Sequence, residues 1–343
     1  MCRLVVAPLL ILLVGGTEAF RICAFNAHRL TLTKVTKESV MDTLVQSEFQ
    51  DSQGYTEKLC LEKQNNNNNN KKLILARCDI MVLQEVVDSS QNTVPFLLQK
   101  LKSIFDSSRS YTFLNSSLLG RSTYKEKYVY IYRGNGGGVD LEERSGGGGW
   151  SDKTQIVNFY QYNDTDDIFA REPFVAQFTL PSKILPSVVL VPLHTTPKDV
   201  EKELNALYHV FLDVSQRWQN ENVILLGDFN ADCASLSKKR LNSLLLRTTA
   251  GFHWVIPDGE DTTVRASTNC TYDRIVMHGR GCQMLLKAAA TFDFPKRFQL
   301  TEEEALRISD HYPVEVELSQ APQGIPPHCL AILLLSLLPS QLD

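Results

Sequence analysis

Short apolar segments that end in polar residues recur along this chain of 343 residues, and they constrain its fold more than any other feature. They are rich in Val, Ile, Tyr and Phe and are bounded by turn residues, as buried β-strands are. The candidate strands span residues 21–27, 80–86, 128–133, 174–180, 188–194, 222–228, 253–256, 272–277 and 313–318. Many strands in a chain long enough for a large core predict an α+β protein, with two packed sheets flanked by helices.

Helical periodicity is clearest between residues 199 and 218. Apolar residues such as Leu204, Leu207 and Phe211 recur there about every 3.6 positions, which predicts one apolar face. Asp199 is a candidate cap for the start of this helix. The helix is therefore expected to cover one face of a sheet.

Both ends of the chain resemble processing signals. Residues 1–19 combine Arg3, an apolar run and small residues before Phe20, which is the pattern of a cleavable signal peptide. Residues 321–343 contain an apolar run about half as long as the roughly twenty residues that span a bilayer. This tail is either a signal for a GPI anchor, the expected route to a membrane, or a hydrophobic end that stays attached. We therefore expect a protein of the endoplasmic reticulum lumen, the medium or the cell surface.

Two segments look like insertions into a single domain at 20–320. Residues 47–72 are polar and include an asparagine run at 65–70, so they lack the apolar surface that would offset the entropy of ordering. Residues 134–150 are rich in glycine, as flexible linkers are. Because long surface loops cost little closure entropy, the domain is expected to tolerate both. A metal site that uses Glu85 would fail if the first insertion displaced that residue.

The charge of the chain limits how it can bind a polyanion. Its formal net charge is −4 and its pI is about 6.0, whereas a module that holds DNA tightly has a basic face. The composition remains compatible with an enzyme that contacts few phosphates and uses metal ions to offset its own acidic groups.

The cysteines divide by their surroundings. Cys233 and Cys270 lie in polar loops and are candidates for a disulfide in an oxidising compartment. Cys23 and Cys78 lie inside apolar runs, so they are predicted to be buried thiols. Three sequons mark candidate glycosylation sites at Asn115, Asn163 and Asn269.

The polar residues at the strand ends share a chemistry. Taken singly, each is explained as a turn or cap residue, and His209, His253 and His278 are assigned to such structural roles. Taken together, they supply oxygen donors suited to a hard cation such as Mg²⁺ and two imidazoles suited to proton transfer near neutral pH. The set consists of Asn26, Glu85, His194, Asp228, Asn230, Asp273, Asp310 and His311.

The motifs around these residues resemble those of the deoxyribonuclease I family, in the same order. They are Phe25-Asn26, Gln84-Glu85-Val86, residues 120–126, Arg171-Glu172-Pro173, Leu193-His194, residues 227–233, residues 267–274 and residues 309–314. The resemblance covers about 20–318 apart from the two insertions. It implies a four-layer αββα sandwich of the endonuclease/exonuclease/phosphatase type. It also implies a monomer that cuts double-stranded DNA and depends on Mg²⁺ (or Mn²⁺) and Ca²⁺.

The resemblance assigns proton transfer to two pairs, His194 with Glu126 and His311 with Asp273. In each pair the carboxylate would fix the tautomer and stabilise the imidazolium, as the buried aspartate of a catalytic triad does. One histidine would deprotonate the attacking water and the other would protonate the leaving 3′ oxygen. Which histidine does which is left open.

The same resemblance implies the remaining roles at the reacting phosphate. Glu85 and Asp310, helped by Asn26, would bind the catalytic metal ion. Asp228 and Asn230 would position or stabilise the phosphoryl group.

DNA-contacting residues also carry over by resemblance, namely Arg121, Tyr124 and Arg171. An arginine pairs with phosphate in bidentate fashion, and a tyrosine ring stacks on a sugar or base. Two positions depart from the family, because Val87 and His28 stand where arginines are expected. This departure predicts fewer groove contacts and weaker binding.

Two structural calcium sites and one disulfide complete what the resemblance implies. The first calcium site would use Asp167, the carbonyl of Phe169, and Glu172; the second would use Asp261, Thr263 and Thr268. The loop at 163–169 has no cysteine, so the second disulfide of the family is absent. Cys233–Cys270 is then the single expected bridge.

Two other functions are weighed against DNA cleavage. A phosphodiesterase of the same fold could act on sphingomyelin or inositol phosphates, but Arg121 and Tyr124 resemble the DNA-cutting branch. A catalytically silent secreted module could bind actin or another protein, but the presence of His194, His311 and Glu85 argues against it. Actin binding itself cannot be predicted from these residues.

Overall fold

The computed structural model describes residues 19–45, 74–104, 111–134 and 154–319. The first insertion and the C-terminal tail lie outside the described residues, as do the signal segment except Ala19 and the second insertion except Gly134. Within the described ranges, no helix combines the length and the apolar character needed to cross a membrane.

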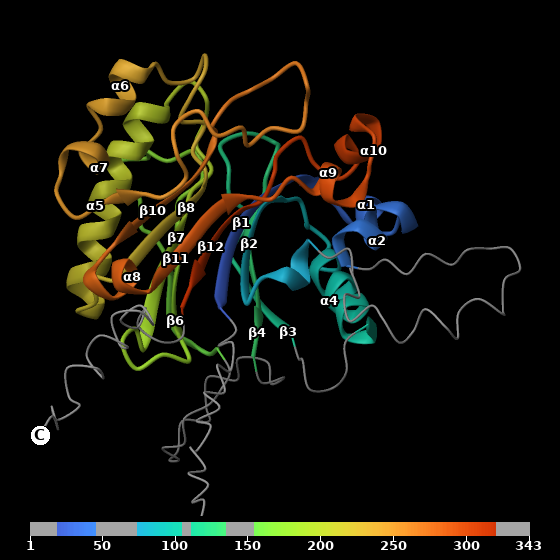
Figure 1. Ribbon diagram of the computed structural model, residues 1–343, viewed down its shortest axis with the longest axis horizontal. Coiled ribbons are helices and arrows are strands. Elements are labelled where there is room, and N and C mark those ends of the chain that lie inside the picture. The colour runs from blue at the N-terminus through green and yellow to red at the C-terminus, as the bar shows by residue number, and fades with distance from the viewer. Residues whose placement is uncertain (1–18, 46–73, 105–110, 135–153, 320–343) are drawn as a thin grey trace, which may run out of the picture.

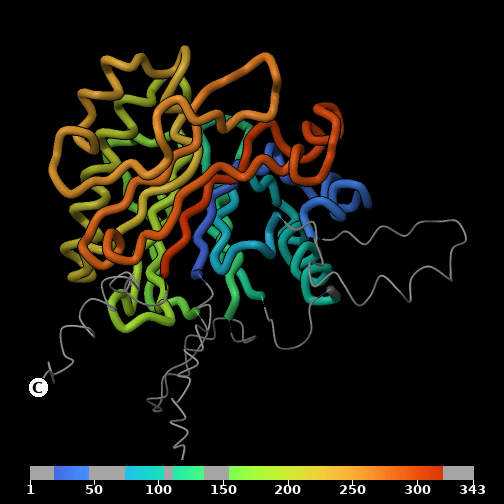
Figure 2. Tube along the Cα trace, viewed as in Figure 1, coloured from blue at the N-terminus to red at the C-terminus, as the bar shows by residue number. Residues whose placement is uncertain are grey.

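The described strands form two six-stranded sheets. The first has the order β11 (Leu286–Thr291), β12 (Val314–Leu318), β1 (Phe20–Leu30), β2 (Ile80–Val86), β4 (Lys127–Arg133) and β3 (Tyr111–Asn115). The second has the order β5 (Ile156–Gln161), β6 (Phe174–Thr179), β7 (Ser187–Pro192), β8 (Val223–Asp228), β10 (Asp273–His278) and β9 (His253–Trp254). β1 pairs in parallel with β2, and β7 with β8, while the other pairs are antiparallel. Figure 2 shows the first strand running beside the last one, β12.

Helices cover the outer face of each sheet (Figure 1). Over the second sheet lie α5 (Val200–Trp218), α6 (Lys238–Asn242) and α7 (Leu245–Thr248). On the side of the first sheet lie α1 (Leu32–Val35), α2 (Glu38–Val45), η1 (Leu75–Arg77), α4 (Thr93–Ile104), α9 (Phe294–Phe298) and α10 (Glu302–Leu306). One further helix, α8 (Arg280–Leu285), follows β10. The predicted αββα sandwich is confirmed.

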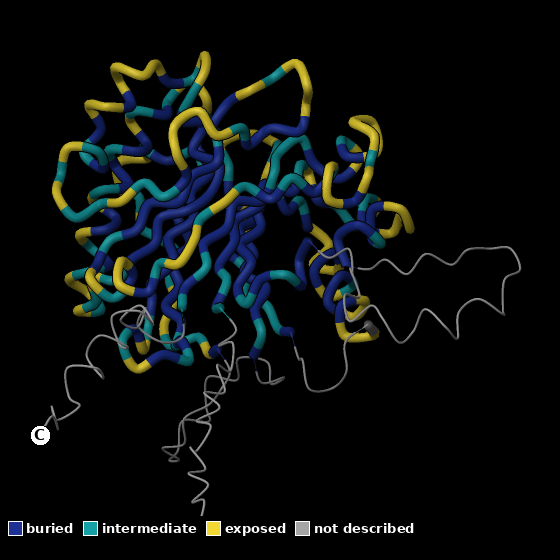
Figure 3. Tube along the Cα trace, viewed as in Figure 1, coloured by how far each residue is buried: buried dark blue, intermediate teal, exposed yellow. Residues whose placement is uncertain are grey.

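Strand alternation explains why the chain forms separate layers of core. Successive side chains of a strand point to opposite faces. In β1, Ile22 and Ala24 pack into the core between the two sheets, whereas Cys23 and Phe25 pack into the core beneath the helices of the first sheet. A third core lies between the second sheet and α5. Both faces of the central strands are therefore buried, as Figure 3 shows.

The sequence-based assignments differ from the structure mainly at sheet edges. The strands β3, β5 and β11 were not predicted, and each is the edge strand of its sheet. β5 and β11 are largely exposed or half-buried, so they lack the apolar run on which the prediction depended. At the start of α5, Asp199 holds the N-cap position, but its side chain forms no capping hydrogen bond, so that expectation was wrong.

Two disulfides are present in the described residues, not one. Cys233–Cys270 is confirmed, with a Cα–Cα distance of 5.8 Å. The prediction of free thiols at Cys23 and Cys78 was wrong, because these residues form a second disulfide with a Cα–Cα distance of 6.2 Å. The parallel pairing of β1 with β2 brings them together, and a reading of each segment by itself could not detect this. Cys282 is a free, buried thiol, and burial raises its pKa to about 12.

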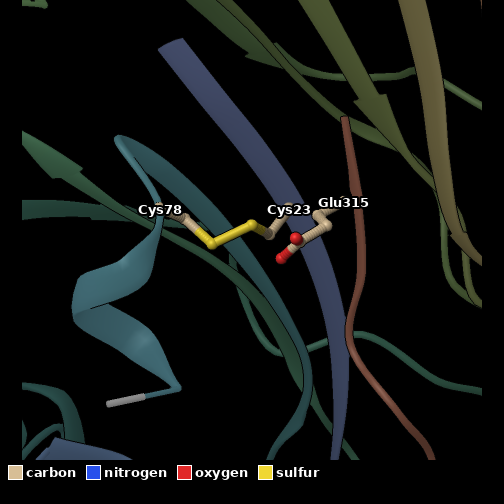
Figure 4. Close-up of side chains that lie close together, drawn as sticks. All are labelled: Cys23, Cys78 and Glu315. Carbon is tan, nitrogen blue, oxygen red and sulfur yellow. A yellow bond between two sulfur atoms is a disulfide. The ribbon is translucent and has the colours of Figure 1, made fainter. Parts of the chain in front are cut away.

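Glu315 lies beside the Cys23–Cys78 disulfide (Figure 4), in a grouping close enough for metal binding. The sulfurs are bonded to each other, however, and both carboxylate oxygens of Glu315 accept hydrogen bonds from Arg77, at 2.7 and 2.6 Å. This cluster is therefore explained as a structural crosslink beside an ion pair.

Candidate active site

The candidate site lies where the ends of strands from both sheets meet. Asn26 of β1 donates from Nδ2 to Asp228 Oδ2 at the end of β8, over 3.0 Å. Antiparallel pairing of β8 with β10 places Asp273 directly opposite Asp228. His194 follows two residues after the end of β7, which is itself the parallel neighbour of β8. Sheet topology thus gathers residues that are far apart in the sequence.

Gln84 joins the two sheets just beneath the site. Its Nε2 donates to the carbonyl of Leu193 over 2.7 Å, and its Oε1 accepts from the backbone amide of Asp228 over 2.8 Å. This approach requires glycine at position 227, where φ is +133° and a Cβ would lie 2.3 Å from Gln84 Nε2. Gln84 and Gly227 had no role predicted from the sequence, although both belong to the motifs shared with the deoxyribonuclease I family.

Two histidine–carboxylate pairs face each other across Asp228. His194 Nδ1 lies 2.8 Å from Glu126 Oε1, and His311 Nδ1 lies 2.7 Å from Asp273 Oδ2. The Nε2 atoms of His194 and His311 lie 3.5 and 3.6 Å from the same oxygen, Asp228 Oδ2. Both predicted pairs are therefore present, and their free ring nitrogens converge on one place.

Neighbouring carboxylates raise the pKa of both imidazoles. Burial disfavours the charge on His194, but the Glu126 carboxylate outweighs it and raises the pKa of His194. Burial likewise opposes charge on His311, yet Asp273 and Asp228 raise its pKa to about 10. A buried imidazolium beside a carboxylate is a suitable proton donor.

Glu85 is held from several directions, and the first insertion does not displace it from the other site residues. Its Oε1 accepts from Asn26 Nδ2 over 3.0 Å, while its Oε2 accepts from the hydroxyl of Tyr124 over 3.1 Å and the amide of Arg29 over 3.0 Å. The backbone of Glu85 has a φ of +55°, in the left-handed region that favours glycine. Such conformations persist where surrounding contacts hold them, often at functional sites.

Asp310 lies beside a residue to which the sequence analysis gave no role in this site. His28 Nδ1 lies 2.6 Å from Asp310 Oδ1. Burial raises the pKa of Asp310, but the hydrogen bond from His28 and the charge of His311 outweigh it and lower the pKa to about 2. Asp310 is therefore ionised, as a cation ligand must be. The position of His28 next to the Phe25-Asn26 motif was the signal that could have identified it.

The predicted DNA-contacting residues share one pocket of about 260 Å³, which reaches the His194–Glu126 pair through Arg171. Its lining consists of Gly120, Arg121, Ser122, Tyr124, Ala170, Arg171, Thr196 and Lys198. Arg171 also supports the site, because its Nε lies 3.0 Å from Glu126 Oε2 and its Nη1 donates to the carbonyl of His194. Lys198 was not predicted, although it follows His194 by only four residues.

The two predicted calcium sites differ in how far their residues come together. Thr263 Oγ1 lies 2.6 Å from Asp261 Oδ1, to which it donates, and 3.1 Å from the carbonyl oxygen of Thr268, so the second set forms a cluster. In the first set, Asp167 instead pairs with Arg121, with 3.2 Å between Oδ1 and Nη2. In the same loop, the amide of Phe169 donates to Asp164 Oδ2, and the backbone carbonyl of Glu172 accepts from Gln161.

Three comparisons with known proteins agree with this geometry. The profile of the Endonuclease/Exonuclease/phosphatase family matches residues 56–311. Deoxyribonuclease-1-like 1 of Mus musculus is 80% identical over 341 residues, covering 99% of this chain and 93% of that protein. Deoxyribonuclease gamma of Homo sapiens is 38% identical over 320 residues, covering 92% of each. An endonuclease/exonuclease/phosphatase from Bacteroides vulgatus shares the fold, with a TM-score of 0.51 at 14% identity over 89% of this chain and 100% of that one.

Two mixed sheets form the sandwich, and their strand ends hold two facing histidine–carboxylate pairs. This arrangement defines a phosphodiester hydrolase. The chain belongs to the Endonuclease/Exonuclease/phosphatase family. Within that family it belongs with the deoxyribonucleases, in the group of deoxyribonuclease-1-like 1. The resemblance inferred from the motifs and the expected class of enzyme are both confirmed.

Proposed function

We propose that this protein is an endonuclease that hydrolyses phosphodiester bonds of double-stranded DNA by in-line attack of water, with a divalent metal ion. The observation that carries the proposal is the convergence of His194 Nε2 and His311 Nε2 on Asp228 Oδ2, at 3.5 and 3.6 Å. General acid–base catalysis at a phosphodiester needs one group to accept a proton and another to donate one. The names of the deoxyribonuclease relatives support DNA as the substrate.

Each histidine–carboxylate pair carries out one of the two proton transfers. One imidazole accepts a proton at Nε2 from the attacking water, while the other donates a proton from Nε2 to the leaving 3′ oxygen. Glu126 and Asp273 each hold the Nδ1 side of the ring, so the Nε2 side faces the reacting phosphate. Asp228 keeps both rings oriented and, with Asn230, positions the phosphoryl group; the amide of Asn230 donates to Asp228 Oδ1 over 3.0 Å.

The metal proposal rests on the fit of the donor atoms. Glu85, Asp310 and Asn26 offer carboxylate and amide oxygens, the donors that Mg²⁺ and Mn²⁺ take. Proteins of this family generally use divalent metals, and such an ion, when bound, neutralises phosphate charge and makes water a better nucleophile. The depressed pKa of Asp310 and the three hydrogen bonds to Glu85 keep both carboxylates ready for a cation.

Binding of DNA is assigned to the pocket beside the His194–Glu126 pair. Arg121 and Arg171 supply guanidinium groups for phosphate oxygens, and Tyr124 supplies a ring for stacking. With a net charge of −4, the protein is expected to hold DNA only at such local sites.

A plasmid-nicking assay tests this function. Supercoiled DNA with Mg²⁺ is expected to be nicked by the protein, and EDTA is expected to abolish the reaction. Glu85→Gln should lower the rate on the order of 10²-fold, because a neutral amide replaces a charged ligand, whereas Glu302→Gln at the exposed start of α10 should leave it unchanged. Nicking that resisted EDTA, or hydrolysis of sphingomyelin or inositol phosphates in place of DNA, would contradict the proposal.

Calcium is proposed to bind at the cluster of Asp261, Thr263 and Thr268, and at the loop of Asp167, Phe169 and Glu172. An ion that binds only the folded state stabilises it, by about 2.7 kcal/mol at a concentration one hundred times its Kd. We therefore expect EGTA to speed cleavage of the protein by trypsin, a protease whose catalysis uses no metal ion. Added Ca²⁺ should restore the resistance to cleavage. Asp261→Asn should remove most of this calcium effect. A proteolysis rate that is the same with and without EGTA would exclude the calcium sites.

The protein is proposed to act as a monomer in the secretory pathway or at the cell surface. The two disulfides found among the described residues fit an oxidising compartment, and Asn163 and Asn269 are exposed and so open to glycosylation. Recovery from the medium or the surface of expressing cells, at monomer size and with a mass lowered by peptide N-glycosidase, is the measurement that checks this. Retention in the cytosol would contradict it.

A further inference from the structure

A lysine that the proposed chemistry does not use lies within electrostatic reach of the metal-binding carboxylates Glu85 and Asp310. Lys34 of α1 is half-buried, and its ammonium group donates to the carbonyls of Ala27 and His28, at 2.9 and 2.6 Å. The ammonium therefore ties the helix to the C-terminal end of strand β1, next to Asn26.

The segment that Lys34 holds has an unusual backbone. His28 and Arg29 both have positive φ values, +45° and +54°, in the left-handed region that non-glycine residues rarely adopt, least of all in succession. At the same place the register between β1 and β2 shifts between Asn26 and Leu30. Such a bend needs contacts that hold it, and the two hydrogen bonds from Lys34 are contacts of this kind.

The bend directs two backbone amides at the metal-binding residues. The amide of His28 donates to Asn26 Oδ1 over 3.0 Å, and the amide of Arg29 donates to Glu85 Oε2 over 3.0 Å. If these residues returned to an extended conformation, successive amides would point to opposite sides of the strand, and both bonds could not form.

We propose that Lys34 is a positioning residue, which holds the His28–Arg29 bend so that Asn26 and Glu85 are oriented to bind the catalytic metal ion. This inference deepens the proposed function and rests on its assignment of Glu85 as a metal ligand. Lys34 does not contact the metal ion; it acts through hydrogen bonds to the backbone segment that orients the ligands.

The charge of Lys34 opposes this effect, which makes the inference testable. An ammonium close to Glu85 and Asp310 repels a cation, so the loss of its charge alone would strengthen metal binding. The loss of the two hydrogen bonds would release the bend and weaken metal binding. Lys34→Met removes both, and the sign of the change in affinity shows which of the two dominates.

The test is the binding of Mn²⁺ to the full-length protein, followed by electron paramagnetic resonance without DNA and with Ca²⁺ present. Lys34→Met is expected to raise the Kd for Mn²⁺ about 10–100-fold, as the loss of partners of metal ligands does. Lys37→Met removes the same charge from an exposed neighbour and should change the Kd less than about twofold. In cleavage assays the metal concentration for half-maximal rate should rise with the Kd, while KM for DNA at saturating metal stays the same.

Two further variants make the result decisive. Glycine adopts positive φ without strain, so Arg29→Gly in the Lys34→Met background should restore part of the affinity, which a general loss of folding would not allow. An unchanged or lower Kd for Lys34→Met, beside a raised Kd for Glu85→Gln, would overturn the role of Lys34 alone. A Glu85→Gln variant that binds Mn²⁺ as the wild type does would overturn the metal site and this inference together.

Discussion

Replacing His194 by alanine is expected to lower the rate of DNA cleavage by about 10²–10⁴-fold, the usual contribution of general acid–base catalysis. The side chain offers Nε2 to the proposed reacting phosphate and holds Glu126 through Nδ1. The fold should persist, because Glu126 keeps its ion pair with Arg171 at 3.0 Å. Rates of plasmid nicking, compared at equal amounts of folded protein by circular dichroism, measure the effect.

His209 provides the matched control. It lies exposed on α5, away from the strand ends that form the site, so His209→Ala should nick DNA at the wild-type rate. If His194→Ala cleaved DNA as fast as His209→Ala, then His194 could be neither the acid nor the base. A loss of activity in both variants would point instead to an effect of the substitutions on folding.

Gly227→Ala is expected to lower the free energy of unfolding by about 2–6 kcal/mol, since it combines backbone strain with overpacking. Position 227 has a φ of +133°, and its new methyl group would lie 2.3 Å from Gln84 Nε2 and 2.5 Å from the Leu193 carbonyl oxygen. The Leu193 oxygen belongs to the backbone and cannot easily move. Because Gln84 ties the two sheets together beneath the site, cleavage activity should fall as well. Urea denaturation measures the loss of stability.

Gly259→Ala separates strain from collision. Gly259 also has a positive φ, +89°, but a Cβ there would have no heavy atom within 4 Å. This variant should therefore lose only the conformational part, about 1–2 kcal/mol. Equal losses for the two variants would mean that the close approach of Gln84 to Gly227 contributes nothing to stability.

The residues with a proposed chemical role could be predicted from the sequence because each is a polar residue at or near the end of an apolar run, a pattern that a few neighbouring residues define. Glu85 and Asp228 each end or nearly end an apolar strand, and His194 and His311 stand beside such strands. The strand alternation that places Ile22 and Phe25 on opposite faces is also present in a short stretch of sequence. Edge strands such as β5 were missed because one face is exposed and the apolar signal is correspondingly weak.

Several contacts could not be predicted because they join segments that only the folded chain brings together. Cys23 and Cys78 looked like separate buried thiols until the parallel pairing of β1 and β2 placed them side by side. Gln84 spans from one sheet to the other, and Lys34 reaches back to carbonyls of the preceding strand. The residues next to each of these side chains in the sequence do not indicate which partner it contacts.

By itself, the sequence determined which segments become strands, which residue ends each of them and which chemical groups stand there, because these properties depend on near neighbours along the chain. The tertiary structure alone decided that two imidazoles meet at one oxygen of Asp228 and that Cys23 of β1 and Cys78, just before β2, become a disulfide. The physical reason is that distances between strands are set by sheet order, register and packing, which are collective properties of the whole core.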